Sequence, residues 1–317
     1  MGCMMNKQKG IRILAVGRAL PGKSLSNRDL EKMVDTSDDW IYERTGIRNR
    51  YRCSIEDVNT LAAAAAKEAI EKSGIDPGEI GVLIVATSSG KYVFPSAAAM
   101  VQKELGLSER ILCFDLSAAC SGFLYAINAA RGLLRDSKKP YALVIGSEQL
   151  SRLVDYTDRN TCILFGDGAG AVLFRLSEKE FYHVSFTEGN KEALYIGGIG
   201  SDIRYLQMNG REVFRFAVKA MERVIEELLM QSGKRLEEID HVICHQANAR
   251  IIQSVSRKHP GLEPRFYMNI ERYGNTSAAS IPIVLSELEE VGRLQGTTCL
   301  MTGFGAGLSY GGILAEL

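Results

Sequence analysis

The chain has 317 residues, of which 46% are hydrophobic and 24% are charged, so it has enough apolar material for a large core. Its 38 lysines and arginines are balanced by 38 acidic residues. A net charge of zero gives no general attraction to nucleic acid or to a membrane surface, so an acidic partner would have to be met by a local basic patch. We therefore expect no nucleic-acid partner and no membrane partner.

The start of the chain shows no targeting segment. The first ten residues are polar, and no apolar run approaches the ~20 residues of a membrane helix. Met1-Gly2 begins like a myristoylation signal, but Asn6 stands where serine or threonine is required. The seven cysteines form no CxxC pair, which favours reduced thiols over a disulfide framework or a zinc site. These features predict a cytoplasmic protein without a metal site.

Strands and helices are expected to alternate along the chain. This alternation is typical of an α/β fold with helix-covered sheets. The first expected helix contains the alanine-rich run 61–66, whose small side chains permit close packing between two layers. Strands are then expected at 80–86, 111–116, 141–146, 171–176 and 241–245, and further helices at 95–105, 121–134, 213–229 and 247–258.

The second half of the chain repeats features of the first. Residues 73–80 match residues 232–239, which lie 159 positions later, and the Ser-Ala-Ala run 117–119 matches 277–279, which lies 160 positions later. Three matches in the same order predict two duplicated βαβ-rich halves. We expect a short extension at 1–10, a first half at 11–174 and a second half at 175–317, joined in one body because no low-complexity linker separates them. The third match pairs 165–170 with 304–307.

Cys120 is the first candidate for a nucleophile. It follows a predicted strand and three small residues, and it precedes Ser121-Gly122 and an amphipathic helix. A thiol at a helix N-terminus lies near unpaired N–H groups and the positive end of the helix dipole, which favour the thiolate. The setting is like the nucleophile elbow, a strand-to-helix turn that exposes its nucleophile. A buried, inert cysteine is the alternative that the local sequence leaves open.

His245 and Asn275 are the next candidates. His245 ends the β-branched run 242–244, and ligand-binding groups in open α/β sheets gather at the carboxyl ends of strands. Asn275 follows Gly274 in a segment that is also typical of a turn and helix cap. Because this segment corresponds to the Cys120 turn in the repeat, a pseudo-twofold axis would place Cys120 and Asn275 opposite each other. A purely structural role stays open for both residues.

The two glycine-rich runs differ from nucleotide-binding loops. Residues 166–170 lack the Lys-Ser/Thr of a phosphate loop and lead into a strand, which argues against a nucleotide-binding oxidoreductase. Residues 304–307 also precede a strand, where glycines would let a turn aim backbone N–H groups at an oxyanion.

Together these motifs resemble the β-ketoacyl-acyl-carrier-protein synthase III family over nearly the whole chain, beginning near Ile11. The resemblance implies an α/β thiolase fold in which the two duplicated halves form a layered αβαβα body. It also implies an acyltransferase that condenses a short-chain acyl-CoA primer with malonyl-acyl carrier protein, releases CO2 and CoA, and so initiates fatty acid synthesis. The matching stretches are TSDDWI at 36–41, RTGI at 44–47, AACSGF at 118–123, FGDGAG at 165–170, HQAN at 245–248 and GNTSA at 274–278.

The resemblance implies a role for each matching residue. Cys120 would carry the acyl group as a thioester, while His245 and Asn275 would stabilise the enolate formed when the malonyl group loses CO2. Removing one such oxyanion donor costs about 3–4 kcal/mol of barrier. The backbone N–H groups of Cys120 and Ala306 would hold the thioester oxyanion, and Phe304 would shield the site.

The same resemblance implies binding residues and partners. The adenine of coenzyme A is expected between Trp40 and Arg159, with Arg44 near the phosphates and Gly210 and Asn248 beside the pantetheine. No cofactor is expected beyond the two substrates. Phe94 would be lent across a homodimer interface to the acyl pocket, and a basic patch for the acyl carrier protein would consist of Arg215, Arg250, Arg257 and Lys258.

Three positions depart from the family pattern. Ala306 stands in the middle of what is often a glycine triplet, and Leu308 and Tyr310 stand where larger aromatic residues are frequent, which leaves primer choice open. The main alternative is an acyltransferase or condensing enzyme of specialised metabolism with the same fold. A degradative thiolase would need a second active-site cysteine, for which Cys299 is the nearest candidate, and an inactive scaffold would have lost the three catalytic residues, all of which are present.

Overall fold

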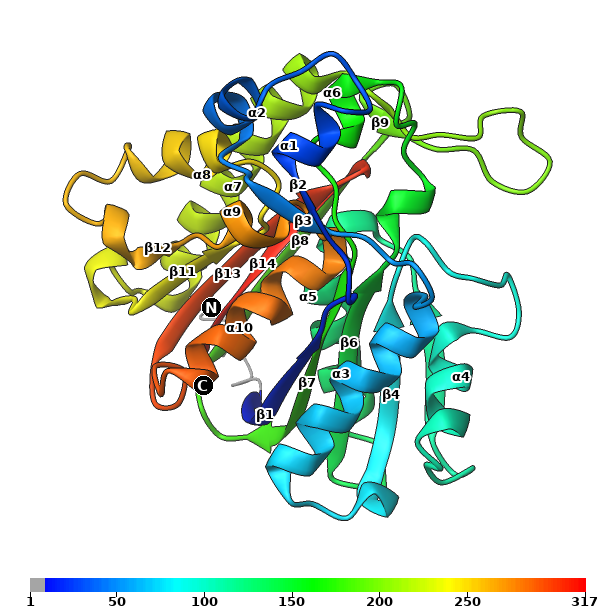
Figure 1. Ribbon diagram of the computed structural model, residues 1–317. Helices are drawn as coiled ribbons and strands as arrows, with labels where there is room; N and C mark the ends of the chain where they lie inside the picture. Colours follow the sequence, from blue (N-terminus) through cyan, green and yellow to red (C-terminus); the bar gives the residue numbers. More distant parts are fainter. Residues whose placement is uncertain (1–8) are drawn as a thin grey trace.

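The computed structural model describes residues 9–317, so the features expected at Met1-Gly2 and Asn6 lie outside the described residues (Figure 1). The first of two five-stranded sheets has the strand order β1-β7-β6-β4-β5. Its two central strands, β4 and β6, are buried along nearly their whole length. The bounds are β1 Gly10–Ala19, β4 Ile80–Ala86, β5 Leu112–Leu116, β6 Tyr141–Glu148 and β7 Gly168–Ser177.

The second sheet repeats the first. Its order, read from the matching edge, is β8-β14-β13-β11-β12, and each neighbouring pair is parallel or antiparallel as in the first sheet. The expected duplication is therefore visible in the strand topology. The bounds are β8 Phe181–Asn190, β11 His241–Cys244, β12 Phe266–Tyr267, β13 Thr298–Gly305 and β14 Gly307–Glu316.

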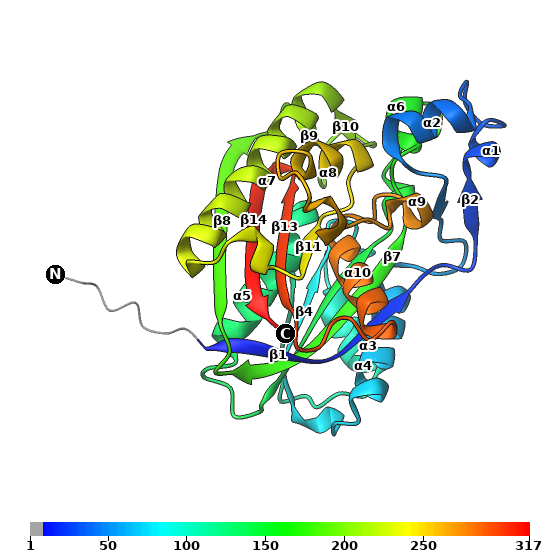
Figure 2. The same cartoon turned by 90° about the vertical axis from the view of Figure 1, so that its left-hand side faces the viewer.

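Helices cover both sheets and separate them. Helices α3 (Val58–Ser73) and α4 (Ala97–Glu104) pack on the outer face of the first sheet, and α7 (Gly210–Ser232) and α8 (Ala249–Ser256) cover the second. Helices α5 (Gly122–Leu133) and α10 (Ser280–Glu290) lie between the sheets. Figure 2 shows these layers in succession, which confirms the predicted αβαβα body.

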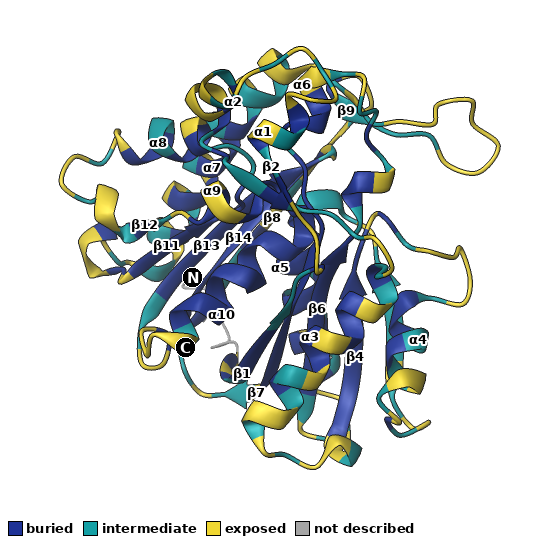
Figure 3. Cartoon of the chain, in the orientation of Figure 1, coloured by how far each residue is buried: buried dark blue, intermediate teal, exposed yellow. Residues whose placement is uncertain are grey.

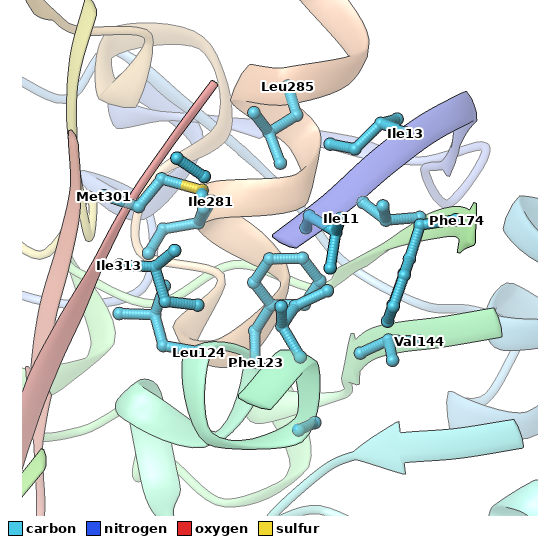
Figure 4. Packing of buried hydrophobic residues seen from close by; sticks show 14 of the residues in the cluster. Ile11, Ile13, Phe123, Leu124, Val144, Phe174, Ile281, Leu285, Met301 and Ile313 are labelled. Atoms are coloured by element: carbon cyan, nitrogen blue, oxygen red, sulfur yellow. The ribbon is translucent and has the colours of Figure 1, made fainter. Parts of the chain in front are cut away.

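Burial follows the layers. The inner strands of both sheets and most of α10 are buried, whereas the edge strands β5 and β8 and the outer faces of the covering helices are partly exposed (Figure 3). One hydrophobic cluster joins Ile11 and Val144 of the first sheet to Met301 and Ile313 of the second through side chains of α5 and α10, such as Phe123 (Figure 4). Burying such side chains contributes about 1.5–3 kcal/mol each, so this central layer holds the two halves together.

Short elements cap the body near the carboxyl ends of the parallel strands. They form two-stranded sheets and single helical turns, and they surround the entrance to the site described below (Figure 1). Their bounds are β2 Ser24–Ser26, α1 Asn27–Leu30, α2 Asp38–Thr45, β3 Asn49–Tyr51, η3 Leu150–Arg152, α6 Arg159–Cys162, β9 Leu194–Tyr195, β10 Gln207–Met208 and α9 Ile270–Tyr273; single turns η1 Pro77–Glu79, η4 Leu236–Glu238 and η5 Glu263–Arg265 precede β4, β11 and β12 at the opposite ends of the strands.

The repeat has a different register from the one that the sequence suggested. Turn η2 (Ala119–Ser121) precedes α5, and turn η6 (Ser277–Ala279) precedes α10, and each turn begins with a non-glycine residue in the left-handed region, with φ of 47° at Ala119 and 50° at Ser277. Ala119 therefore corresponds to Ser277, so the match of 117–119 with 277–279 was shifted by two residues. The division after residue 174 stays a prediction, and a boundary that keeps β7 whole would follow Ser177.

Candidate active site

Cys120 lies in the turn η2, between the end of β5 and the start of α5. The turn that joins β13 to β14 packs directly against it. A Cβ added to Gly305 would lie 2.6 Å from the backbone nitrogen of Cys120 and 3.0 Å from the Cβ of Ala119, so only glycine fits there. The next residue, Ala306, does not adopt a positive φ, so its side chain causes no backbone strain.

The environment of Cys120 favours the neutral thiol. Burial raises the pKa of Cys120 to about 12, the charge of Glu148 raises it further, and a hydrogen bond from Ser277 opposes both effects. The expectation that the helix N-terminus alone would favour the thiolate is therefore wrong, because desolvation outweighs it. Proton removal from this thiol needs a nearby acceptor.

His245 follows β11 and is buried. Its backbone N–H donates to the carbonyl of Thr302 at 2.8 Å, and its Nδ1 lies 2.7 Å from the Oγ of Ser280. Because the backbone N–H of Gln246 donates to the same Oγ, the Ser280 hydroxyl can donate to Nδ1, which leaves Nε2–H as a donor. Burial lowers the pKa of His245 to about 3, so the imidazole is neutral at physiological pH.

Asn275 lies beside Phe165 in an isolated β-bridge and is also buried. Its backbone N–H donates to the carbonyl of Leu164 at 2.8 Å. The side-chain Oδ1 accepts a hydrogen bond from the backbone N–H of Ser277 at 2.9 Å. This contact fixes the amide orientation and leaves the Nδ2 group as the donor that the side chain can offer to a substrate.

These three residues border one site although they are far apart in the sequence. Ser277, two positions after Asn275, lines the same cavity as Cys120, and its hydroxyl lowers the pKa of that thiol. The ring of Phe304 packs edge-on against His245, with centroids 5.4 Å apart, and the next residue, Gly305, abuts Cys120. The strand β13 and the turn η6 thus connect the surroundings of the three residues, of which Cys120 alone lines the cavity described next.

Cys120 lines a cavity of about 780 Å³ whose walls are mainly apolar. A second cavity of about 980 Å³ opens beside α2 and α7, and the two share Leu206. The two cavities therefore adjoin at Leu206. Predicted residues on the second cavity are Trp40, Arg44, Gly210, Arg215, Asn248 and Arg250.

The residues expected to bind the adenine lie together but contact one another. The guanidinium carbons of Arg44 and Arg159 lie 4.7 Å and 5.0 Å from the ring centroid of Trp40, and Arg159 also donates to the carbonyl of Asp35 at 3.0 Å. An adenine that stacks on Trp40 would displace one guanidinium from the ring. Arginine suits either arrangement because it stacks on aromatic planes and binds phosphate.

Asn248 has a structural role in addition to its place on the cavity wall. Its Nδ2 donates to the carbonyl of Arg44 at 3.0 Å, and its Oδ1 accepts from the backbone N–H of Arg250 at 2.9 Å, which caps α8. Both ends of the amide are therefore engaged. A pantetheine contact by this side chain would have to share these hydrogen bonds.

The four residues of the predicted basic patch are exposed, but they are not equivalent. Arg215 and Arg250 line the mouth of the second cavity. Lys258 forms an ion pair with Glu222 at 2.5 Å, so part of its charge is already neutralised. Arg257 is the C-cap residue of α8, next to Lys258.

Phe94 is 85% exposed and lies in the loop that follows β4. It does not line the Cys120 cavity of its own chain within the described residues. Its neighbours Tyr92 and Val93 are exposed as well. Three consecutive exposed hydrophobic residues form a surface that a partner could cover.

The remaining candidates lie away from the thiol. Cys299 is buried near the start of β13, six residues from Gly305, which corresponds to about 20 Å along a strand. It cannot serve as the second cysteine of a degradative thiolase. Leu308 lines a separate cavity beside α7, and Tyr310 stacks on Phe186 with centroids 4.8 Å apart, so the described lining of the Cys120 cavity includes neither.

Three residues of the site were missed from the sequence: Glu148, Ser277 and Ser280. Glu148 directly follows the apolar strand run, and a charged residue at the carboxyl end of a buried parallel strand was a usable signal. The two serines gave none, because their contacts with Cys120 and His245 depend on how η6 and α10 pack.

Comparisons with known proteins agree with this geometry. The sequence matches the family described as 3-oxoacyl-[acyl-carrier-protein] synthase III over residues 114–190 and the C-terminal part of that family over residues 229–317. A β-ketoacyl-[acyl-carrier-protein] synthase III from Clostridium tetani is 43% identical, with 98% of this chain and 99% of the relative covered. The chain belongs to this family. It is therefore an acyltransferase-type condensing enzyme, and the predicted family and enzyme class are confirmed.

Solved structures of β-ketoacyl-ACP synthase III enzymes share the fold. The crystal structure of 3-oxoacyl-[acyl-carrier-protein] synthase III from Aquifex aeolicus VF5 is similar with a TM-score of 0.92 and 43% identity, covering 97% of this chain and all of that one. The priming β-ketosynthase of the R1128 polyketide biosynthetic pathway is similar with a TM-score of 0.91 and 32% identity, covering 100% and 99% of the two chains. The thiolase fold is thereby confirmed.

Proposed function

We propose that the chain initiates fatty acid synthesis by condensing a short-chain acyl-CoA with malonyl-acyl carrier protein through an acyl-Cys120 thioester. The observation that supports this most is that contacts through Ser277, Phe304 and Gly305 connect the surroundings of Cys120 to a neutral His245 and an oriented Asn275, although only Cys120 of the three lines the cavity of about 780 Å³. A nucleophile and two neutral hydrogen-bond donors suit acyl transfer followed by enolate formation.

The first half-reaction acylates Cys120. Its sulfur attacks the thioester carbonyl of the acyl-CoA, and the coenzyme A sulfur leaves. The oxyanion forms next to the turn where Gly305 abuts the Cys120 nitrogen, so the N–H groups of Cys120 and Ala306 are the proposed donors. The apolar wall of the cavity, including Leu150 and Phe165, would hold a short acyl chain.

The second half-reaction uses His245 and Asn275. Loss of CO2 from the malonyl group leaves an enolate whose oxygen would accept hydrogen bonds from His245 Nε2–H and Asn275 Nδ2–H. Neither group carries a proton that titrates near neutral pH, so both stay donors. The carbanion then attacks acyl-Cys120 and gives the 3-ketoacyl product. Phe304, packed against His245, would keep water from the enolate.

The two substrates share one entrance. The second cavity would receive the adenine and phosphates of coenzyme A at Trp40, Arg44 and Arg159, and the pantetheine arm would pass Gly210, Asn248 and Leu206 to reach Cys120. The acidic acyl carrier protein would dock on the patch of Arg215, Arg250, Arg257 and Lys258 at the same mouth. No metal or prosthetic group is required by this chemistry.

We further propose a homodimer in the cytoplasm. Strand β5 is an edge strand with an exposed Leu112, and the exposed loop containing Phe94 follows the adjacent strand β4. A second copy placed on this edge would cover both and could insert its Phe94 into the Cys120 cavity. Within residues 9–317, none of the helices combines the length and apolarity that crossing a bilayer requires.

A role in specialised metabolism is the second candidate, because the polyketide priming synthase shares the fold and a third of its residues. Incubation with acetyl-CoA and malonyl-acyl carrier protein, with product detection on the carrier by mass spectrometry, tests the first proposal. It predicts acetoacetyl-acyl carrier protein with matched release of CO2 and CoA. Acyl transfer to another acceptor without CO2 release would favour the second candidate.

A further inference from the structure

Glu148 is a fully buried carboxylate at the end of β6, beside the nucleophile. It accepts hydrogen bonds from the hydroxyls of Thr87 at 3.3 Å, Ser89 at 2.5 Å and Ser277 at 3.1 Å, and from the backbone N–H of Ser88 at 3.2 Å. All of these donors are neutral. Among residues 9–317, no ion pair is found for Glu148.

A buried carboxylate without a cationic partner is costly. Of the other two buried carboxylates among residues 9–317, Glu287 pairs with Arg272, whereas Asp167 is held, like Glu148, by hydroxyl and backbone donors. Elements packed against β6 include α3, α5 and α10, and their charged residues have other partners. Glu289 pairs with Lys72. Glu290 pairs with Arg18, Glu68 with Lys72, and Arg131 donates to the Lys9 carbonyl.

Ser277 connects this carboxylate to the nucleophile. Its hydroxyl donates to Glu148 Oε1 and also lowers the pKa of the Cys120 thiol. A hydroxyl has one proton, so Ser277 donates to Glu148 while the Cys120 thiol is neutral and can donate to Ser277. Once Glu148 is protonated, Ser277 can donate to the Cys120 thiolate instead, which is the contact that lowers the pKa of Cys120. The left-handed backbone of Ser277, with φ of 50°, holds the hydroxyl at this position.

We propose that Glu148 accepts the Cys120 proton through the Ser277 hydroxyl during acylation, so that Cys120 and Glu148 share one proton. This rests on the proposed role of Cys120. Glu148 acts through Ser277 and touches no substrate, so it is a positioning residue for the proton. The titratable group that faces it is Cys120, and its other contacts are hydroxyl and backbone donors.

The proton path balances. As Cys120 Sγ bonds to the acyl carbon, its S–H bond breaks and the proton passes to Ser277 Oγ, which gives its own proton to Glu148. When the tetrahedral intermediate collapses, the bond between the acyl carbon and the coenzyme A sulfur breaks, and that sulfur keeps the electron pair. The proton held by Glu148 returns through Ser277 to the departing sulfur. No external acid or base is needed while the substrate fills the cavity.

The electrostatics agree with this exchange. Burial raises the pKa of Glu148 to about 7, which lets the carboxyl bind a proton near neutral pH. The negative charge of Glu148 raises the pKa of Cys120, and protonating Glu148 removes that repulsion. Moving the proton therefore relocates one negative charge inside the site rather than creating a second.

The test is the pH dependence of Cys120 alkylation by iodoacetamide, with the modified peptide identified by mass spectrometry. This needs no acyl donor, so its failure would not count against acyl transfer. In the wild type the alkylation rate should level off above about pH 7. Above this pH Cys120 and Glu148 hold one proton between them, and moving it from Cys120 to Glu148 forms the thiolate without changing the net charge, so the thiolate fraction no longer depends on pH. In Glu148→Gln the levelling should vanish, and the rate should keep rising about tenfold per pH unit and exceed the wild type.

Two further variants separate the relay from a structural role. Ser277→Ala leaves the Glu148 charge but removes the hydroxyl between it and the sulfur. Its alkylation profile should stay level above about pH 7 at a lower rate, because the Ser277 hydroxyl stabilises the thiolate, while single-turnover acylation by acetyl-CoA should slow; unchanged acylation would contradict the relay. Ser309→Ala removes another buried hydroxyl at the Cys120 turn, one bonded to Ser121 and Ala118, and should keep the wild-type profile. A wild-type rate that rises continuously, or a level profile retained in Glu148→Gln, would overturn the proposal.

Discussion

Replacing Asn275 with alanine should separate the two half-reactions. The side chain offers its Nδ2–H group to the site because Oδ1 is held by the Ser277 N–H at 2.9 Å. Loss of one preorganised oxyanion donor costs about 3–4 kcal/mol, which slows malonyl decarboxylation by about 10²–10³-fold. Acylation of Cys120 uses other donors and should change by less than about tenfold.

The same substitution should also reduce stability. It leaves the buried Ser277 N–H without its acceptor, which costs about 1–3 kcal/mol of unfolding free energy. Asn275→Asp is the matched variant, because it keeps an oxygen for Ser277 but offers no amide N–H to the enolate. Asn275→Asp also buries a charge without a cationic partner, so stability should not recover fully, while decarboxylation stays slow.

Two assays check this division. Single-turnover acylation by acetyl-CoA is followed by intact-protein mass, and decarboxylation is followed by CO2 release from malonyl-acyl carrier protein. Equal loss of both half-reactions in a stably folded Asn275→Ala variant would refute the reasoning, since acylation is not expected to use the Asn275 donor.

Three further predictions concern His245, Gly305 and Cys299. Burial lowers the pKa of His245 from its ordinary 6.5 to about 3, so the unfolded chain binds the His245 proton first as pH falls. Urea unfolding should therefore show the wild type losing stability relative to His245→Asn from about pH 7 to pH 5. An equal loss of stability in both proteins would contradict this prediction. Gly305→Ala places a Cβ 2.6 Å from the Cys120 nitrogen and should slow acylation about 100-fold, whereas Gly132→Ala in α5, where an added Cβ meets nothing within 4 Å, should not. Cys299→Ala should retain condensing activity in a product assay, because Cys299 is distant from the site; loss of acyl transfer in a stably folded variant would reopen the thiolase alternative.

The sequence predicted the elements better than their boundaries. Residues 80–86 form a strand with the expected limits, but the helix expected at 247–258 is α8, Ala249–Ser256. Helix α8 begins after Asn248 because the side chain of Asn248 caps it. The hydrophobic pattern of the sequence does not distinguish a capping residue from the first residues of a helix, so the expected helix began too early. Strands β1, β8, β12 and β13 were not predicted, although they complete both sheets, whereas the strand expected after residues 304–307 is β14.

The repeat was recognised with a shifted register for a physical reason. Both turns, η2 and η6, approach neighbouring backbone closely, so both need small residues. The similarity of 117–119 and 277–279 therefore arises from this shared packing requirement and does not mark equivalent positions of the two halves. The helix starts at Gly122 and Ser280, together with the left-handed residues Ala119 and Ser277, show the correspondence.

The candidate site was predictable in its principal residues but not in its support. Cys120, His245 and Asn275 each follow a recognisable motif. The partners Ser277, Ser280 and Glu148 depend on contacts between elements that are distant in the sequence, such as β6 with η6. The high pKa of the thiol follows from burial in the folded chain, which no local pattern reports.

The most direct test of this account is the intact mass of the protein after incubation with acetyl-CoA alone. The wild type should gain one acetyl group, and peptide mapping should locate it on Cys120. Cys120→Ser, which preserves the shape of the turn, should gain none at neutral pH while it keeps the wild-type unfolding transition. An acetyl adduct that persists on the folded Cys120→Ser protein would show that the acyl group is carried elsewhere.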